Sequence, residues 1–242
     1  MAIKWVDRVA THPGRVQLTP VQGQTNIYDM ERADEPTVAG TPVNAANLNA
    51  MQKNMGLDAN MTVYVAVSGS DATGNGSSTA PYQTITKALS TIPKNLNGYS
   101  AYISVSAGTY NDDVQISGFT GGIIGLIGTA GETVTINSLV IFYSSLVVIR
   151  NFDLVVNNTN DSHAIQVYSS DFSCTTKITC SGGLSRGLHA VTFSRVFISN
   201  LIVTSASESA VRSEYSEVSL GSVSGNVLGI GFRAYGGLCA LF

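Results

Sequence analysis

A repeated pattern fills residues 139–242 and restricts what this chain can fold into. Five aromatic residues each close a short run of alternating apolar and polar residues, and a serine or glycine follows each of them: Tyr143, Tyr168, Phe193, Tyr215 and Tyr235. Their positions differ by 25, 25, 22 and 20 residues. Ser, Thr, Val and Ile dominate the intervals, which favours strands over helices. A period of this size, built of short strands, is typical of a solenoid, so we interpret each repeat as one coil of a parallel β-helix.

Stacked coils place equivalent positions above one another at the strand spacing of about 4.8 Å. We therefore expect the five aromatic side chains to form a ladder in which each ring lies near the next. Its direction stays open. Gln166 and Arg233 share a face with their aromatics and favour an outward ladder, whereas Arg212 and Glu214 favour the reverse in their coil. Slips of one residue between coils would reconcile the two patterns, and the sequence does not locate them.

Composition bounds the classes of function. Apolar residues make up 44% of the 242-residue chain, enough for a core, and charged residues only 12%. The formal net charge of −3 gives no basic surface for nucleic acid, and no apolar run has the length of a membrane span. The first residues lack the apolar segment of a secretory signal peptide. Cys174, Cys180 and Cys239 show no metal-ligand spacing, and we expect small buried residues.

The N-terminal region, residues 1–57, is expected to be an irregular arm followed by a short helix. Proline and glycine interrupt its apolar pieces up to about residue 40, which argues against long regular elements and against an independent core. Residues 41–56 predict one short helix in which Leu48, Met51 and Met55 form a narrow apolar seam. Because so short a helix is marginal alone, the seam packs either in a three-stranded bundle or against its own domain.

Residues 58–100 are expected to lead into the solenoid. A strand at residues 62–67 and a Gly/Ser-rich loop come first. An amphipathic helix follows, ended by Pro93, with apolar positions at Ile85, Ala88, Leu89 and Ile92. This helix is expected to cover the open apolar end of the first coil.

Residues 101–242 are expected to be the coils themselves. Two coils without the aromatic marker occupy residues 101–138, so with the five marked repeats we expect roughly seven coils. The last run ends within a coil. We therefore expect either that the coils continue beyond residue 242 in a longer protein or that another chain covers this end.

Two segments carry a resemblance to known proteins. The stretch YVAVSGSDATGNGSSTAPYQTITKAL resembles the start of right-handed parallel β-helices of the pectate-lyase type, where a strand, a Gly/Asp/Asn loop, a Pro-aromatic-x-Thr-Ile step and a helix precede the first coil. Residues 5–52 are similar to the N-terminal segment of tail fibre, tailspike and baseplate-associated proteins in phages and prophages of Gram-positive bacteria. The Pro-Gly-Arg-Val step and the Gly-Thr-Pro-Val-Asn-Ala-Ala-Asn-Leu-Asn helix start carry that second resemblance.

The resemblance implies an all-β fold, a right-handed parallel β-helix with a capping helix, preceded by the irregular arm and short helix. It further implies a homotrimeric tail fibre or tailspike that projects its β-helix toward the host surface for receptor binding. The expected partners are tail or baseplate proteins and host cell-surface polysaccharide, with no nucleic acid, no membrane insertion and no cofactor. The expected location is the virion, assembled in the host cytoplasm. The residues expected to make attachment and trimerisation are Trp5, Tyr28, Leu48, Met51 and Met55.

A polysaccharide depolymerase on the same scaffold is the alternative, and a bacterial surface adhesin, which would need a signal peptide, is a third. Hydrolysis needs paired carboxylates, which a solenoid would carry at equivalent positions of neighbouring coils. Asp112 and Asp113 are adjacent and point to opposite faces of a strand. Asp171 and Glu217 lie close to one shared position, but Arg195 of the intervening coil separates them and is itself placed to pair with Glu217. We therefore expect no catalytic residue in this chain.

Two further polar groups have ordinary structural explanations. Asp71, Asn75 and Ser77 are expected to form a solvated turn rather than a calcium site, because one carboxylate among glycines is a poor cation ligand set. His163 and His189 stand where coils begin and are expected to be hydrogen-bonded turn residues rather than bases. No metal site is therefore expected.

Overall fold

The computed structural model of the chain describes residues 9–10, 16–20, 22–23, 28–32, 36–38, 56–158, 163–182, 184–227 and 230–242. The chain forms two compact units, Met1–Met55 and Gly56–Phe242. In the first unit β1 (Val9–Ala10) pairs with β4 (Pro36–Val38), and β2 (Val16–Pro20) pairs with β3 (Tyr28–Arg32), all antiparallel. The arm is therefore not irregular throughout, because one short ladder is nested within the other.

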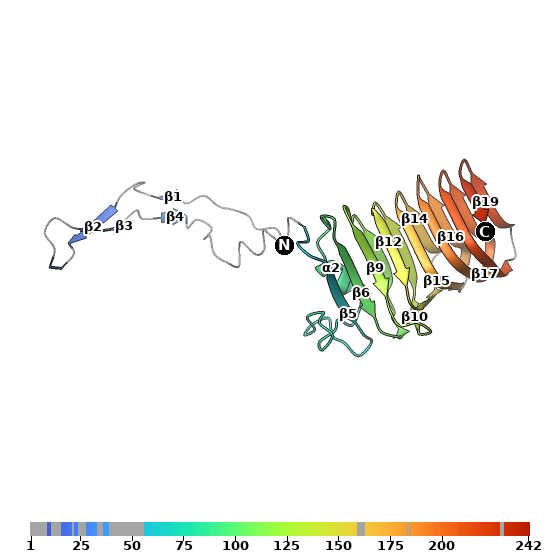
Figure 1. Ribbon diagram of the computed structural model, residues 1–242, viewed down its shortest axis with the longest axis horizontal. Helices are drawn as coiled ribbons and strands as arrows, with labels where there is room; N and C mark the ends of the chain where they lie inside the picture. The colour runs from blue at the N-terminus through green and yellow to red at the C-terminus, as the bar shows by residue number, and fades with distance from the viewer. Residues whose placement is uncertain are drawn as a thin grey trace. The chain divides into compact units, whose positions relative to one another are not determined.

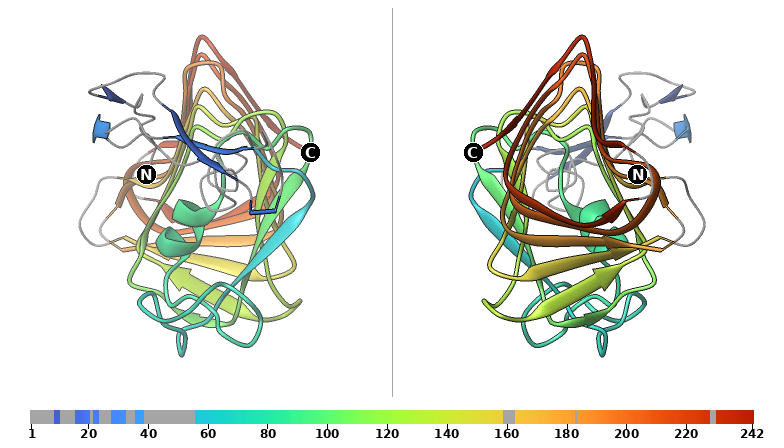
Figure 2. Two further views of the ribbon diagram at one scale, coloured as in Figure 1. Left: turned by 90° about the vertical axis from the view of Figure 1, so that its left-hand side faces the viewer. Right: turned by 90° about the vertical axis from the view of Figure 1, so that its right-hand side faces the viewer.

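The second unit is a parallel β-solenoid of stacked coils (Figure 1), and the end views show its three faces (Figure 2). The first face consists of β5 (Met61–Val65), β6 (Ser100–Val105), β9 (Ile123–Ile127), β12 (Leu146–Arg150), the first parts of β15 (Asp171–Ser181), β17 (Arg195–Glu214) and β18 (Glu217–Val227), and β20 (Leu238–Leu241). The second face consists of β7 (Gly108–Thr109), β10 (Thr133–Ile136), β13 (Asp153–Asn157) and the following parts of β15, β17 and β18. The third face consists of β8 (Asp113–Ser117), β11 (Ser138–Phe142), β14 (His163–Tyr168), β16 (Leu184–Val191), the last part of β17, and β19 (Ile230–Tyr235).

Alternation along each strand places one set of side chains inside the coils. β6 shows the pattern plainly, with Ala101, Ile103 and Val105 buried and their neighbours partly exposed. In-register pairing then stacks the inward residues into columns that run the length of the solenoid. One such column of fully buried side chains contains Ile103, Leu126, Ile149, Cys174, Ile198 and Leu220. The core is therefore continuous from coil to coil, as the prediction of a parallel β-helix requires.

The solenoid has about six turns, one fewer than the repeat pattern suggested. The first complete coil runs through β6, β7 and β8, and the second through β9, β10 and β11. Tyr143 follows β11 directly, so it closes the second coil and does not mark a third. The sequence estimate counted residues 121–138 and the run around Tyr143 as two coils, whereas they are parts of one.

The capping helix is α2 (Ile85–Thr91), and it lies across the N-terminal end of the solenoid (Figure 2). Thr84 is its N-cap and accepts a hydrogen bond from the backbone N–H of Lys87 at 3.1 Å. The four apolar positions with helical spacing are all buried: Ile85, Ala88, Leu89 and Ile92. The predicted helix of residues 41–56 lies almost wholly outside the described residues.

Candidate functional site

The turn from the third face to the first face contains a stack of buried serines, which we call the serine corner: Ser144, Ser170, Ser194 and Ser216. The exposed Gly237 takes the equivalent place in the last coil. Hydroxyls of this stack form hydrogen bonds between neighbouring coils. The N–H of Ser144 donates to Oγ of Ser170 at 3.0 Å, and the N–H of Ser194 donates to Oγ of Ser216 at 3.2 Å. The hydroxyls of Ser170 and Ser216 donate in turn to carbonyls of their own coils. These bonds fix the corner and so fix the side chains around it.

The repeat aromatics lie at this corner and most of them point to solvent. The exposed fraction is 68% for Tyr143, 82% for Phe193, 64% for Tyr215 and 48% for Tyr235. Tyr168 is half-buried, and its hydroxyl donates to Oε1 of Gln166 at 2.7 Å. The direction that the sequence left open is therefore outward.

The five aromatics do not occupy equivalent positions, so the simple ladder is wrong by one residue. Tyr143, Phe193 and Tyr215 lie within the turn, in left-handed backbone with φ of 50°, 56° and 52°. Tyr168 and Tyr235 instead end the strands β14 and β19, and in register they are opposite Phe142 and Glu214 of neighbouring coils. From the last residue of one strand to the first residue of the next, the chain advances three residues in some coils and four in others. This difference is the one-residue slip that the alternating pattern did not locate.

The rings of these aromatics also do not stack on one another in the described part of the chain. Within the described ranges, no ring contact joins two of the five aromatics: Tyr143 packs edge-on against Phe142, and Tyr168 against His189. Tyr215 instead covers the next coil, since a Cβ on Gly236 would lie 2.7 Å from its Cε1. A left-handed conformation costs a non-glycine residue roughly 1–2 kcal/mol. Retaining it at three exposed aromatics suggests that their outward position serves a purpose beyond folding.

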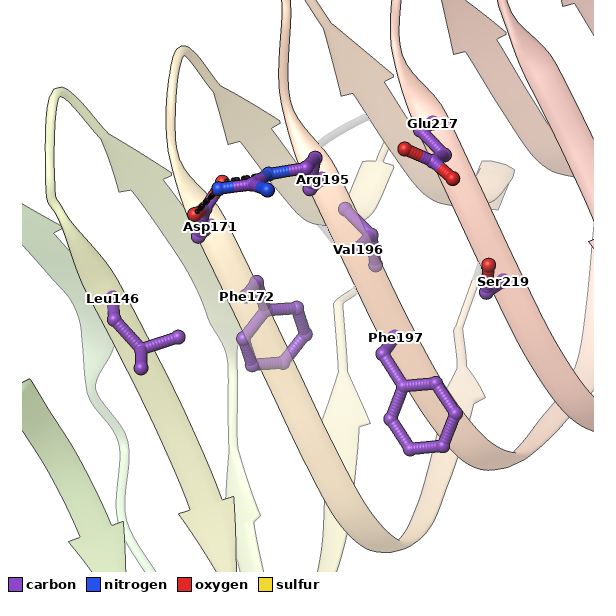
Figure 3. A pocket seen from close by; sticks show the side chains of 8 residues that line it. All are labelled: Leu146, Asp171, Phe172, Arg195, Val196, Phe197, Glu217 and Ser219. Atoms are coloured by element: carbon purple, nitrogen blue, oxygen red, sulfur yellow. Dashed lines mark hydrogen bonds and ion pairs between the residues drawn. The ribbon is translucent and has the colours of Figure 1, made fainter.

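A column of charged side chains lies on the first face, directly after the serine corner (Figure 3). Asp171, Arg195 and Glu217 are consecutive partners in register. Nε of Arg195 donates to Oδ1 of Asp171 at 3.0 Å, and Nη2 pairs with Oδ2 of the same carboxylate. This hydrogen bonding to Asp171 raises the pKa of the Arg195 guanidinium. The expected partner of Arg195 was Glu217, so the pairing is corrected to the acidic residue of the preceding coil.

Together the charged column and two of the repeat aromatics, Phe193 and Tyr215, line a surface depression that we call the corner groove. One part has a volume of about 430 Å³, and an adjoining part that shares Arg195 and Glu217 has about 600 Å³. The first part is lined by Leu146, Asp171, Phe172, Arg195, Val196, Phe197, Glu217 and Ser219. The second is lined by Phe193, Ser194, Arg195, Tyr215, Ser216, Glu217, Gly236, Gly237 and Leu238. Exposed aromatic faces beside carboxylate and guanidinium groups are suited to holding a hydroxyl-rich ligand.

A second polar cluster, which sequence reasoning missed, lies on the third face. The rings of His163 and His189 stack with centroids 4.9 Å apart, and Nε2 of His163 is 2.5 Å from Nη1 of Arg186. Nε2 of His189 is 3.3 Å from Oε1 of Glu214. Both histidines belong to strands, β14 and β16, so the expectation of turn residues is wrong. The strand register shifts between Leu184 and Arg186 next to this cluster. No pattern in the sequence predicts this shift.

We expect His189 to make folding stability depend on pH. Burial lowers the pKa of His189 below its ordinary value of 6.5, although the hydrogen bond with Glu214 opposes this. Below that pH the unfolded chain therefore binds the proton more readily, and stability falls. Urea unfolding one pH unit above and one below 6.5 should show a lower midpoint at the acidic pH, and His189→Gln should reduce the difference. An equal difference in both proteins would contradict this assignment.

The remaining candidate residues have the following places. The carboxylate of Asp71 accepts hydrogen bonds from the N–H groups of Gln83 and Thr84 and from the Thr84 hydroxyl, so it supports the start of α2. Burial alone would raise the pKa of Asp71, but these hydrogen bonds outweigh it and lower the pKa. Asn75 accepts from the N–H of Ser77 within a turn.

The cysteines and the attachment residues complete the set. Cys174 and Cys180 are buried, Cys239 is half-buried, and all three are free thiols. Burial raises the pKa of Cys180 to about 12. Tyr28 begins β3, but its side chain is outside the described part of the chain. Four other residues expected to make attachment and trimerisation lie outside the described residues altogether: Trp5, Leu48, Met51 and Met55.

The described residues contain no group of three or more His, Cys, Asp or Glu side chains placed to hold a metal ion. None of the helices in the same residues is long and apolar enough to cross a membrane.

Comparison with known proteins gives one match. Residues 67–117 match the model of a family described as a protein of unknown function, DUF1565. The match covers the loop before α2, the helix itself and the first complete coil. It fits a β-helix protein, in agreement with the solenoid. No curated protein and no solved structure matches the chain.

Proposed function

We propose that this protein is the receptor-binding component of a phage or phage-tail-like particle and that its corner groove binds host cell-surface polysaccharide. In this proposal the N-terminal unit attaches a homotrimeric fibre or tailspike to the baseplate. The observation that carries it is the outward position of Phe193 and Tyr215 beside the Asp171–Arg195–Glu217 column. Aromatic faces stack on the apolar faces of sugar rings, while charged side chains bond their hydroxyls.

Truncating the groove aromatics should weaken glycan binding without disturbing the fold. We expect Phe193→Ala and Tyr215→Ala each to weaken binding to a matching glycan roughly tenfold, the loss of one well-packed aromatic contact. The measurement is a glycan array of bacterial surface polysaccharides, followed by titration of the best neutral ligand. Tyr143→Ala is the matched control, because Tyr143 has the same left-handed backbone at the same corner but does not line the groove. Equal losses in all three variants would contradict the groove assignment.

Trimer formation is a separate part of the proposal. Light scattering of the full chain should give the mass of three copies, and a chain that begins at Gly56 should give the mass of one. The shortened chain begins at Gly56 because Gly56–Phe242 is a compact unit with its own hydrophobic core. A full-length monomer would overturn self-trimerisation, and a trimer that survives the cut would assign the interface to the solenoid.

Polysaccharide hydrolysis in the same groove is the second candidate. Asp171 and Glu217 both line it and are two coils apart, about 9.6 Å at the sheet spacing. An inverting glycosidase separates its carboxyls by roughly 6.5–9.5 Å. Against this, Arg195 lies between the two and its guanidinium is bonded to Asp171. We expect no release of reducing ends from any glycan that binds, and release abolished by Glu217→Gln would establish the enzyme instead.

A further inference from the structure

A row of polar side chains crosses the third face on four successive coils. Gln166, His189, Arg212 and Arg233 are consecutive partners in register on β14, β16, β17 and β19. Their flanking residues point inward: Leu188 and Ala190 are buried on either side of His189, and Val211 is buried before Arg212. The row therefore faces outward. Three coil spacings separate its ends, about 14 Å at the sheet spacing, which suits an extended ligand better than a single ion.

The two arginines are the unusual members of this row. Arg212 and Arg233 are directly opposite one another on adjacent strands, an arrangement of like charges that is destabilising in itself. The positive charge of Arg212 is balanced, because its Nε pairs with Oε1 of Glu214. Its guanidinium also lies 5.0 Å from the ring centroid of Tyr235. For Arg233, Nε is buried and has no hydrogen-bond partner among the residues that the structure describes.

The neighbouring charges leave the row positive. Glu214 is bonded by both Arg212 and His189. Burial would raise the pKa of Glu214, but these hydrogen bonds outweigh it and lower the pKa. The negative charge of Glu214 is therefore balanced by Arg212 and does not offset Arg233. Arg186 and Glu208, at the edge of the same face, form their own ion pair. Among the residues that the structure describes, the guanidinium charge of Arg233 in this row is thus uncompensated, on a chain whose formal net charge is −3.

We propose that Arg212 and Arg233 together bind the carboxylate of an acidic polysaccharide, with the ring of Tyr235 packing against the sugar. Guanidinium groups match a carboxylate in planar, two-pronged geometry, and an anion between them relieves the repulsion of the pair. Tyr235 is nearly half exposed beside Arg212 and offers a stacking surface. The site lies on the third face, shares no lining residue with the corner groove, and stands without the proposed function.

The test titrates the intact protein with three carboxylate-bearing polymers, polygalacturonate, alginate and hyaluronan, and with neutral dextran. We expect at least one acidic polymer to bind, with an affinity that falls as salt is added. Arg233→Gln should weaken that binding roughly tenfold, the effect of losing one charged hydrogen-bonding group. Arg150→Gln is the matched control, because Arg150 is a partly exposed arginine of β12 that belongs neither to the row nor to the corner groove. Arg195→Gln is measured beside it to report on the corner groove.

Each other outcome overturns the proposal. If none of the three acidic polymers binds at low salt, the site does not exist. If Arg195→Gln weakens acidic binding and Arg233→Gln does not, the acidic ligand belongs to the corner groove. In that case the proposed function stands while this inference fails. If Arg233→Gln unfolds at the same temperature as the wild type, its weaker binding does not come from a loss of fold. In the wild type, the NMR signal of the Arg233 Nε–H should shift when galacturonate is added.

Discussion

Replacing Asp112 with alanine should lower the free energy of unfolding by about 3 kcal/mol, since a buried carboxylate with several charged hydrogen bonds is lost. Asp112 is only 8% exposed. Its Oδ2 accepts from the N–H groups of Ile85 and Thr86 at 2.7 and 3.1 Å, and its Oδ1 accepts from the Thr86 hydroxyl at 2.7 Å. It thereby joins the first complete coil to the start of α2. Urea unfolding followed by far-UV circular dichroism measures the change.

The adjacent residue supplies the control for this prediction. Asp113 is exposed, and the one hydrogen bond found for its carboxylate comes from the Ser138 hydroxyl at 2.8 Å. Asp113→Ala should therefore cost less than about 1 kcal/mol, as surface substitutions usually do. Equal losses for the two variants would show that the junction between coil and helix does not depend on Asp112.

Replacing Phe152 with alanine should cost about 3–5 kcal/mol, the range for removing a buried phenylalanine. Phe152 lies between β12 and β13 and is among the largest fully buried side chains. Coils above and below hold their own registers through the ladders, so the space has little freedom to collapse. The measurement is again the urea midpoint, with Phe152→Leu expected to lose much less because most of the volume is kept.

Gly128 provides an independent check on that packing. A Cβ added there would lie 2.9 Å from Cδ1 of Phe152, so Gly128→Ala should destabilise the protein by about 1–3 kcal/mol through overpacking. In the Phe152→Leu background the same substitution should cost less, because the ring edge is gone. Strictly additive losses would mean that the two residues do not compete for space.

The large features of the fold were predictable from the sequence because they repeat. Alternating β-branched residues at intervals near 25 predict stacked strands, and the helical spacing of Ile85, Leu89 and Ile92 predicts α2. Both depend on patterns that many residues share. The two nested ladders of the arm were missed, because Val9 pairs with Val38 across almost thirty residues and neither strand has enough residues to show alternation.

The site was predictable only in part, since it depends on single residues. The sequence left two alternatives open for the aromatic side chains, inward or outward. The corner turn sets their direction, and it advances three residues in some coils and four in others. Spacing places Arg195 equally between Asp171 and Glu217, so only coordinates show which carboxylate it binds. The row containing Arg212 and Arg233 requires knowledge of the register across two coils, which depends on slips invisible in the sequence.

The serine corner has a consequence for how such a protein can change over evolution. The same hydrogen bond joins Ser144 to Ser170 across 26 residues and Ser194 to Ser216 across only 22. Coils of different length therefore meet at one seam. The corner turn takes up one residue of the difference, and further register shifts occur near Cys174 and near Leu184. Insertions and deletions at those distant bends can widen or narrow the solenoid while the groove beside the seam keeps its shape. The width of the solenoid and the residues of the corner groove can thus change independently during evolution.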